Sequence, residues 1–242
     1  MKRIAPFLII IAVLGVALGS AWYLTKPGST STNSTPAAST NQTAPAAAAQ
    51  SPKSTQLSAV RTGVPGAEPA HTKGPANAPA QIEEFGDFQC PPCGAFHPIL
   101  EQMEAEFGNK LRVTFREYPL PIHTHALRAA SAAEAAGMQG KFWEMHKLIY
   151  DHQKEWKDQF DVRAVFDDYA KQIGLDVERF NRDLSGGEVA QRVIQDGKRG
   201  QSMGVSGTPT VFLNGREVPF EMLAAEKLRV LIQNQILSAG NE

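Results

Sequence analysis

The sequence predicts an α/β fold whose sheet is interrupted in sequence by a long helical insertion. An alternating strand, a helix and a second alternating strand give a β-α-β opening between residues 81 and 116. Helical patterning then continues from about residue 124 to 203, and a short hairpin with a final helix follows. At 242 residues and 42% hydrophobic content, the chain is long enough for one well-buried domain with appendages.

The N-terminus has the pattern of an export signal. Lys2 and Arg3 precede an uncharged, mostly apolar stretch that approaches membrane-spanning length. We therefore expect residues 1–25 to be a signal peptide or a membrane anchor. Residues 4–24 are expected to hold the chain in the inner membrane, with cleavage and release into the periplasm as the alternative. Either way, the remainder lies on the extracytoplasmic face of the cell envelope.

A low-complexity segment follows the export signal. Residues 27–60 are nearly all Ser, Thr, Ala, Pro, Gln and Asn, and they contain no aromatic residue. Such a composition buries too little apolar surface to offset the entropy of ordering. We expect residues 26–75 to be a disordered linker and residues 76–240 to be the folded domain.

The first elements of the folded domain follow from side-chain spacing. Ile82, Glu84 and Phe85 belong to a short strand. A helix after Cys90 carries apolar residues at helical spacing, namely Phe96, Leu100, Met103 and Phe107. Apolar and polar residues then alternate from residue 111 to 116, which predicts a half-buried strand.

Helices dominate the middle of the chain. An Ala-rich run ends at Gly137, and further helices are expected over residues 142–153, 162–173 and 177–184. A longer helix is expected to begin at Ser185-Gly186-Gly187-Glu188, which has capping-box spacing. The insertion spans about residues 122–203. Two strands around Asn214-Gly215, a pair that suits a type I′ turn, precede a last helix at about residues 220–237.

The charge balance argues against a nucleic-acid partner. From residue 74 onward, 18 Lys and Arg stand against 24 Asp and Glu. Phosphate backbones require clustered positive charge, which this part of the chain lacks.

Cys90 and Cys93 are the only cysteines, and their spacing favours a reactive pair over a structural disulfide. A disulfide closing so short a loop removes little entropy from the unfolded chain, so it stabilises the fold little. A cysteine at the first turn of a helix faces free backbone N–H groups that stabilise a thiolate. We therefore predict that Cys90 exchanges disulfides with substrates and that Cys93 resolves them. Pro91 and Pro92 suit the first helical positions.

Metal binding is the rival interpretation of this motif. Cys90, Cys93 and His97 have C-x2-C-x3-H spacing, which is able to begin a zinc or copper site. No fourth ligand stands nearby in the sequence, and His123 and His125 are expected at the surface. We predict no metal site, and a metal-binding chaperone that uses Cys90 and Cys93 is the alternative from a different functional class.

Four separated blocks of the chain form a recognisable set. They are Glu84-Phe85-Gly86-Asp87-Phe88-Gln89-Cys90-Pro91-Pro92-Cys93, Phe115-Arg116-Glu117-Tyr118-Pro119-Leu120-Pro121, Gly140-Lys141-Phe142-Trp143-Glu144-Met145-His146 and Gly204-Val205-Ser206-Gly207-Thr208-Pro209-Thr210-Val211-Phe212. In these blocks the chain resembles the DsbA-like branch of the thioredoxin superfamily, in particular its N-terminally anchored exported members. The resemblance covers about residues 74–237.

The resemblance implies a thioredoxin-like fold with an inserted helical domain. It also implies that Pro209 is a cis-proline beside the cysteines and that Thr208 offers main-chain hydrogen bonds to an extended substrate. Glu84 matches the buried acid that accepts the proton of the resolving thiol.

One departure from the family leaves the direction of electron flow open. Strongly oxidising members carry a histidine inside the dipeptide, where its charge stabilises the thiolate, and this chain has Pro92 there. The leading prediction is an enzyme, a thiol-disulfide oxidase, and a reductase or isomerase of the same fold is the alternative. Its expected partners are reduced or misoxidised exported proteins and a DsbB-type membrane redox partner. We expect a monomer that needs no cofactor.

Overall fold

The computed structural model describes residues 57–240 of the chain. Within them, five strands form one sheet in the order β1-β3-β2-β4-β5. Their bounds are β1 (His71–Lys73), β2 (Ala80–Gly86), β3 (Leu111–Glu117), β4 (Thr210–Leu213) and β5 (Arg216–Val218). The central strands β2 and β3 are parallel, and β4 pairs antiparallel with β2. The predicted β-α-β opening is therefore confirmed.

Two helices cover one face of the sheet, α2 (Pro91–Phe107) and α9 (Ala225–Ala239). Their apolar side chains share one core with the inward residues of the strands, among them Ile82, Leu100 and Leu228. Side chains alternate along β2, so Ile82 and Glu84 point to this face. Glu83 and Phe85 point to the opposite face, where the end of α8 packs.

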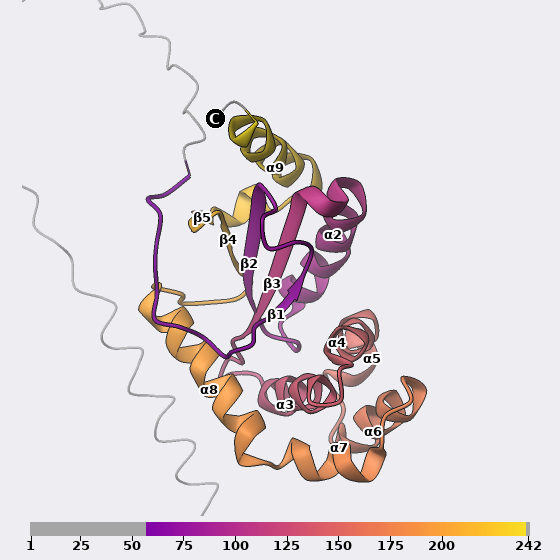
Figure 1. Cartoon of the computed structure of the whole chain (residues 1–242). Helices are drawn as coiled ribbons and strands as arrows, with labels where there is room; N and C mark the ends of the chain where they lie inside the picture. The colour runs from indigo at the N-terminus through magenta and orange to yellow at the C-terminus, as the bar shows by residue number, and fades with distance from the viewer. Residues whose placement is uncertain (1–56, 241–242) are drawn as a thin grey trace, which may run out of the picture. The chain divides into compact units, whose positions relative to one another are not determined.

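The predicted helical insertion consists of six helices between β3 and β4. They are α3 (Ala126–Gly137), α4 (Phe142–Asp151), α5 (Gln153–Trp156), α6 (Arg163–Gln172), α7 (Val177–Leu184) and α8 (Gly187–Ser202). Figure 1 shows α3 to α7 grouped at one end of the sheet, with α8 running back toward β4. The small side chains of α3 lie buried at the centre of this group, where they let the neighbouring helices approach closely.

Helix α2 joins the two largest hydrophobic cores of the described residues. Cys90 and Cys93 pack with the apolar residues of the helical insertion, whereas Phe96 and Leu100 pack with the sheet. The β2-to-α2 junction therefore lies where both cores meet.

The folded part begins earlier in the sequence than composition predicts. Strand β1, at His71–Lys73, falls inside the predicted linker at residues 26–75 and pairs antiparallel with β3. The His71 ring stacks on Phe142 at 3.5 Å between centroids. Long-range contacts create this strand, and three residues are too few to show a period in the sequence. The boundary at residue 76 is corrected accordingly.

Two local predictions on helix ends are wrong, and one turn is confirmed. The N-cap residue of α8 is Gly186, and no side chain accepts a hydrogen bond from the backbone N–H groups of the first turn. The capping-box prediction is therefore wrong. The last helix begins at Ala225, because residues Phe220–Met222 form a separate 3-10 turn. Asn214 and Gly215 both have positive φ, at 47° and 75°, as a type I′ turn requires.

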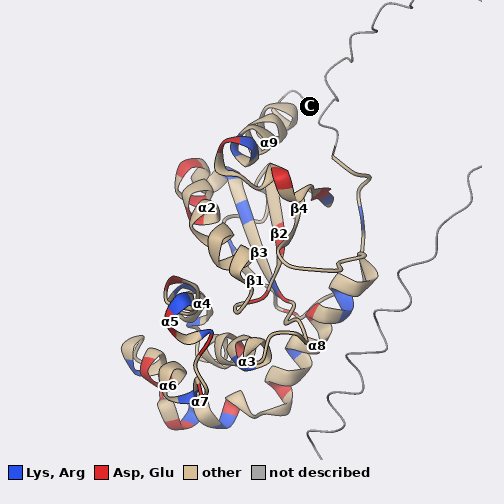
Figure 2. Ribbon diagram, turned by 180° about the vertical axis from the view of Figure 1, so that it is seen from behind, with Lys and Arg blue, Asp and Glu red and all other residues tan. Residues whose placement is uncertain are grey.

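The predicted export segment at residues 4–24 and the predicted linker up to residue 56 lie outside the described residues. Among the residues that the structure describes, no helix is long and apolar enough to cross a bilayer. Figure 2 shows acidic and basic residues intermixed on α8 and α9.

A buried ionic network ties α8 to the sheet. Asp196 is 1% exposed and accepts hydrogen bonds from the Ala67 and Glu117 backbone N–H groups at 2.7 and 3.2 Å. Its carboxylate also pairs with buried Arg116 at 3.0 Å. Arg116 in turn shares Glu83 with Arg199. The network fixes the position of the helix that leads into the loop before β4.

Replacement of Asp196 by Ala should destabilise the fold strongly. It leaves Arg116 partly uncompensated and orphans two buried N–H groups, for which we expect a loss of about 3–5 kcal/mol of unfolding free energy. Urea denaturation followed by circular dichroism measures this loss. Glu144→Gln, at an exposed position of α4, is the control and should leave the unfolding free energy unchanged within error. Equal midpoints for wild type and Asp196→Ala would contradict the assigned role.

Candidate active site

The two cysteines lie at the N-terminus of α2, as the sequence predicts. Cys90 is the N-cap residue, with extended backbone angles of −68° and 119°, and Pro91 and Pro92 occupy the first two helical positions. Both prolines are exposed, whereas Cys90 is 4% and Cys93 0% exposed. Both cysteines are free thiols in this structure. Only Cys90 of the two retains contact with solvent.

The environments of the two thiols shift their pKa values in opposite directions. A hydrogen bond from the Cys93 thiol, assisted by the Thr208 side chain and opposed by burial, lowers the pKa of Cys90 to about 6. Burial raises the pKa of Cys93, and the bond to Cys90 and the charge of Glu84 raise it further. At neutral pH, Cys90 is therefore mainly a thiolate and Cys93 a thiol.

The loop before β4 lies against Cys90. The Thr208-Pro209 peptide bond is cis, which confirms the prediction from the resemblance. The Cys90 thiol donates to the Thr208 carbonyl oxygen at 3.3 Å. The Thr208 hydroxyl is buried without a hydrogen-bond partner, so it is free to turn toward the thiolate. Thr208 thus offers its carbonyl oxygen as an acceptor to the Cys90 thiol and its hydroxyl as a donor to the Cys90 thiolate.

Glu84 lies buried on β2, also as predicted. It is 2% exposed, and its Oε1 atom has no hydrogen-bond partner. Burial first, and then the charges of Glu104 and Cys90, raise the pKa of Glu84 to about 8. At neutral pH the group is mostly a neutral acid that is able to release or take up a proton near Cys93.

Two glutamines that sequence patterning missed anchor the cysteine loop to the helical insertion. Buried Gln153 donates from Nε2 to the carbonyls of Phe88 and Cys90, at 2.7 and 2.9 Å. Gln89 donates to the Lys157 carbonyl at 2.6 Å and accepts from the backbone N–H of His125 at 2.5 Å. Neither contact has a local signature, because the partners are more than 30 residues apart.

Asp87 organises the same loop. Its carboxylate accepts from the Gln89 and Leu120 N–H groups at 2.7 and 2.8 Å. The Nδ1 atom of His123 lies 2.7 Å from the same carboxylate. Asp87 thus holds two chain segments together beside the cysteines.

The structure does not bring His97 to the cysteines as a ligand set. In the described part of the chain, the one group of three possible metal ligands within reach of a common ion is His97, Glu101 and Asp151. His123 bonds to Asp87, and the Nε2 atom of His125 lies 2.7 Å from the Gln159 carbonyl. A metal site built from Cys90, Cys93 and His97 therefore has no support in the geometry.

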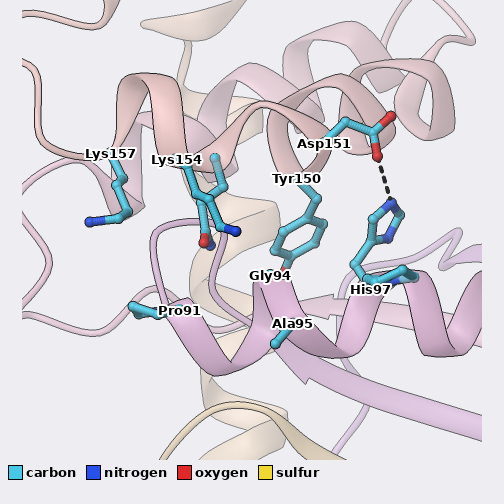
Figure 3. Close-up of a pocket in the computed structure, with 10 residues that line it drawn as sticks. Pro91, Gly94, Ala95, His97, Tyr150, Asp151, Lys154 and Lys157 are labelled. Carbon is cyan, nitrogen blue, oxygen red and sulfur yellow. Dashed lines mark ion pairs between the residues drawn. The ribbon is translucent and has the colours of Figure 1, made fainter. Parts of the chain in front are cut away.

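Two surface pockets flank the cysteine motif. Figure 3 shows the first, of about 410 Å³, between the start of α2 at Pro91 and the α4–α5 segment that carries Lys154 and Lys157. The second, of about 390 Å³, lies on the other side of the motif and is lined by Pro92, Phe96, Phe220 and Leu223 among others. Its walls are mostly apolar.

Several solved structures of other proteins share this fold. BdbD from Bacillus subtilis aligns with a TM-score of 0.62 at 22% identity, over 69% of this chain and 92% of that one. A thioredoxin-like oxidoreductase from Silicibacter pomeroyi aligns at 0.57 and 24% identity, over 72% and 93%. MdbA from Corynebacterium diphtheriae, a thiol-disulfide oxidoreductase, aligns at 0.55 and 20%, over 65% and 89%. At these identities, the likeness establishes the fold.

Curated relatives with higher identity carry the name of a Na(+)/H(+) antiporter, NhaA. The protein from Salinispora arenicola is 42% identical over 147 residues, which are 60% of this chain and 22% of that protein. The one from Mycolicibacterium vanbaalenii is 37% identical over 166 residues, 66% of this chain and 26% of that protein. The chain thus spans about a quarter of the length of these relatives.

The thioredoxin family model matches residues 67–234, well over half of the chain. The match begins before β1 and ends within α9, so it covers the whole sheet, the helical insertion and both cysteines. With its sheet, its cysteine motif at a helix N-terminus and its cis-proline, this chain belongs to the thioredoxin family.

Proposed function

We propose that the chain is an extracytoplasmic thiol-disulfide oxidoreductase that forms disulfides in exported proteins through Cys90 and Cys93. The observation that carries this proposal is the asymmetry of the two thiols. Cys90 combines a lowered pKa with residual solvent contact, whereas Cys93 is fully buried with a raised pKa. Disulfide exchange with a large substrate requires one reachable sulfur and one sulfur that waits behind it.

The reaction begins from the Cys90–Cys93 disulfide. A substrate thiolate attacks the Sγ atom of Cys90, and the S–S bond breaks with its electron pair on Cys93. Protonated Glu84 then supplies a proton to the Cys93 thiolate. A second substrate thiolate attacks the substrate sulfur of the mixed disulfide, so the substrate leaves with a disulfide and Cys90 leaves as a thiolate. The enzyme gains the two electrons that the substrate loses.

The stabilised Cys90 thiolate favours the oxidising direction. A thiolate with a low pKa is a good leaving group, and its stabilisation favours the reduced enzyme, which makes the disulfide a stronger oxidant. In place of the histidine that the dipeptide lacks, the Cys93 thiol and the Thr208 side chain provide the stabilisation. This supports an oxidase over a reductase or isomerase.

Partners and location follow from this chemistry as parts of the proposal. The substrates are reduced or misoxidised exported proteins, recognised in extended form beside Thr208 and Pro209. Each turnover leaves two thiols in the enzyme, so a membrane redox partner of the DsbB type must accept two electrons. The export segment at residues 4–24 places the monomeric domain on the periplasmic side of the inner membrane. The name antiporter refers to relatives that are about four times as long as the part matched by this chain, and we do not extend antiporter activity to the chain.

The oxidised full-length protein should form one disulfide in a reduced, unfolded protein for each Cys90–Cys93 disulfide consumed. Thiol counting by mass spectrometry after alkylation measures both sides of the exchange. Cys90→Ser should abolish the reaction, because no reachable sulfur remains. Loss of substrate thiols with the Cys90→Ser variant would overturn the proposal.

A trapping variant tests the order of attack within the same reaction. Cys93→Ala removes the resolving sulfur and with it the enzyme disulfide. The Cys90 thiolate of this variant still attacks substrate disulfides, which is the reverse of the second transfer step, and one substrate sulfur leaves as a thiolate. Because no internal sulfur can release the substrate, mixed disulfides through Cys90 should accumulate in cells as species that disappear on reduction. The double variant Cys90→Ser/Cys93→Ala is the control and should accumulate none. If Cys90→Ser alone traps substrates through Cys93, the assigned roles are reversed.

Glu84→Gln should slow the exchange and stabilise the fold. Without a proton donor and acceptor beside Cys93, we expect disulfide transfer at pH 7 to slow by about a hundredfold, at the lower end for general acid–base catalysis. The carboxyl has a pKa of about 8 when folded and ionises near 4.3 when unfolded, so wild-type stability falls as pH rises across that window.

The glutamine variant has no such pH-dependent loss. Its unfolding free energy should exceed that of wild type at pH 8, and the difference should vanish below pH 4. Stopped-flow fluorescence and urea denaturation at several pH values measure the two effects. An unchanged transfer rate together with a stability gain would show that Glu84 is only a buried structural acid.

A further inference from the structure

We propose that His97, Glu101 and Asp151 form a binding site for one divalent transition-metal ion, with zinc as the representative ion. The site contains neither cysteine. It lies between the catalytic helix α2, which supplies His97 and Glu101, and the last residue of α4, which supplies Asp151.

The three ligand atoms already have the spacing that an ion requires. The Nε2 atom of His97 lies 3.7 Å from Oε1 of Glu101 and 3.5 Å from Oδ1 of Asp151. All three ligand atoms lie within 4.8 Å of one another. Ligands at about 2.1 Å from a tetrahedral zinc ion are about 3.4 Å apart, so small side-chain rotations close the site.

The burial of the His97 Nε2 atom is a second, independent indication that this side chain is a metal ligand. Its side chain is 7% exposed, and its buried Nε2 atom has no hydrogen-bond partner. Figure 3 shows the ring directed at Asp151 across the edge of the pocket. Its plane is stacked on Tyr150, at 5.1 Å between centroids and 22° between planes. Burying an imidazole nitrogen without a hydrogen-bond partner costs folding free energy. Packing holds the Nε2 atom of His97 toward the two carboxylates.

Access and coordination number also suit a zinc-type ion. The Glu101 and Asp151 side chains are 36% and 37% exposed, so an ion can enter from solvent and water can complete four-coordination. One imidazole nitrogen and two carboxylate oxygens are normal zinc ligands. Calcium takes six to eight oxygen ligands, and this site offers two carboxylates and a nitrogen.

A lysine ammonium group pairs with both carboxylates of the proposed site. The Nζ atom of Lys147 lies 2.8 Å from Oε1 of Glu101 and 3.1 Å from Oδ2 of Asp151. Its side chain is 52% exposed and flexible, so it can swing into solvent when an ion neutralises the two carboxylates. The ammonium therefore competes with the metal.

The position of the site gives metal binding a structural consequence. His97 follows Cys93 by one helical turn, and Asp151 stands two residues before Gln153, which holds the Cys90 carbonyl. A bound ion would join α2 to the helical insertion beside the redox pair. Binding should therefore raise the melting temperature of the protein.

Isothermal titration of the oxidised full-length protein in mild detergent with zinc chloride tests the proposal. In oxidised protein both sulfurs are blocked by their disulfide, so they cannot bind the ion. We expect one zinc ion per chain and a raised melting temperature. Glu101→Gln and Asp151→Asn should each weaken binding by at least about tenfold. Lys147→Met should tighten it, because the competing ammonium is gone.

Glu104→Gln is the matched control. Glu104 lies on the same helix three residues beyond Glu101 and pairs with Lys73, so its loss should leave zinc affinity unchanged. The site is ruled out if oxidised wild type binds no zinc, or if both ligand variants bind as wild type does. Binding confined to the reduced protein would place the ion on the cysteines and overturn the proposal. Calcium binding as tight as zinc binding would overturn the choice of metal.

Discussion

The hydrogen bond between the two thiols is the interaction on which the active site depends. The Cys93 thiol donates to the Cys90 sulfur and is the largest influence lowering the pKa of Cys90. The same bond raises the pKa of Cys93, together with its burial. One contact therefore makes a nucleophilic thiolate and a proton-bearing thiol from two identical side chains, at a spacing of one helical turn.

The rest of the fold keeps that pair in place. Pro91 and Pro92 begin α2 without unsatisfied N–H groups, and Gln153 fixes the Cys90 carbonyl from the helical insertion. On the other side of Cys90, the Thr208 carbonyl oxygen accepts a hydrogen bond from the Cys90 thiol. Because Cys90 and Cys93 pack in the helical core while the rest of α2 packs on the sheet, the relative position of the two cores sets the geometry of the sulfurs.

Much of this arrangement follows from local sequence, and its remainder follows from distant contacts. The cysteine positions, the cis-proline and the burial of Glu84 were predictable, because a motif or a family block marks each one. Strand β1 and Gln153 were not, since each depends on partners far away in the chain. The sequence spacing of His97 relates it only to the nearby cysteines, whereas the fold turns it toward Asp151, 54 residues later in the sequence.

The asymmetry of the thiols can be measured directly. Reduced protein treated with iodoacetamide at a series of pH values, quenched and mapped by mass spectrometry, gives the alkylation rate of each cysteine. This asymmetry predicts that Cys90 alone reacts with iodoacetamide in the native protein, with a rate that rises through a midpoint near pH 6. Equal labelling of both cysteines, or a Cys90 midpoint near that of an ordinary thiol, would contradict it.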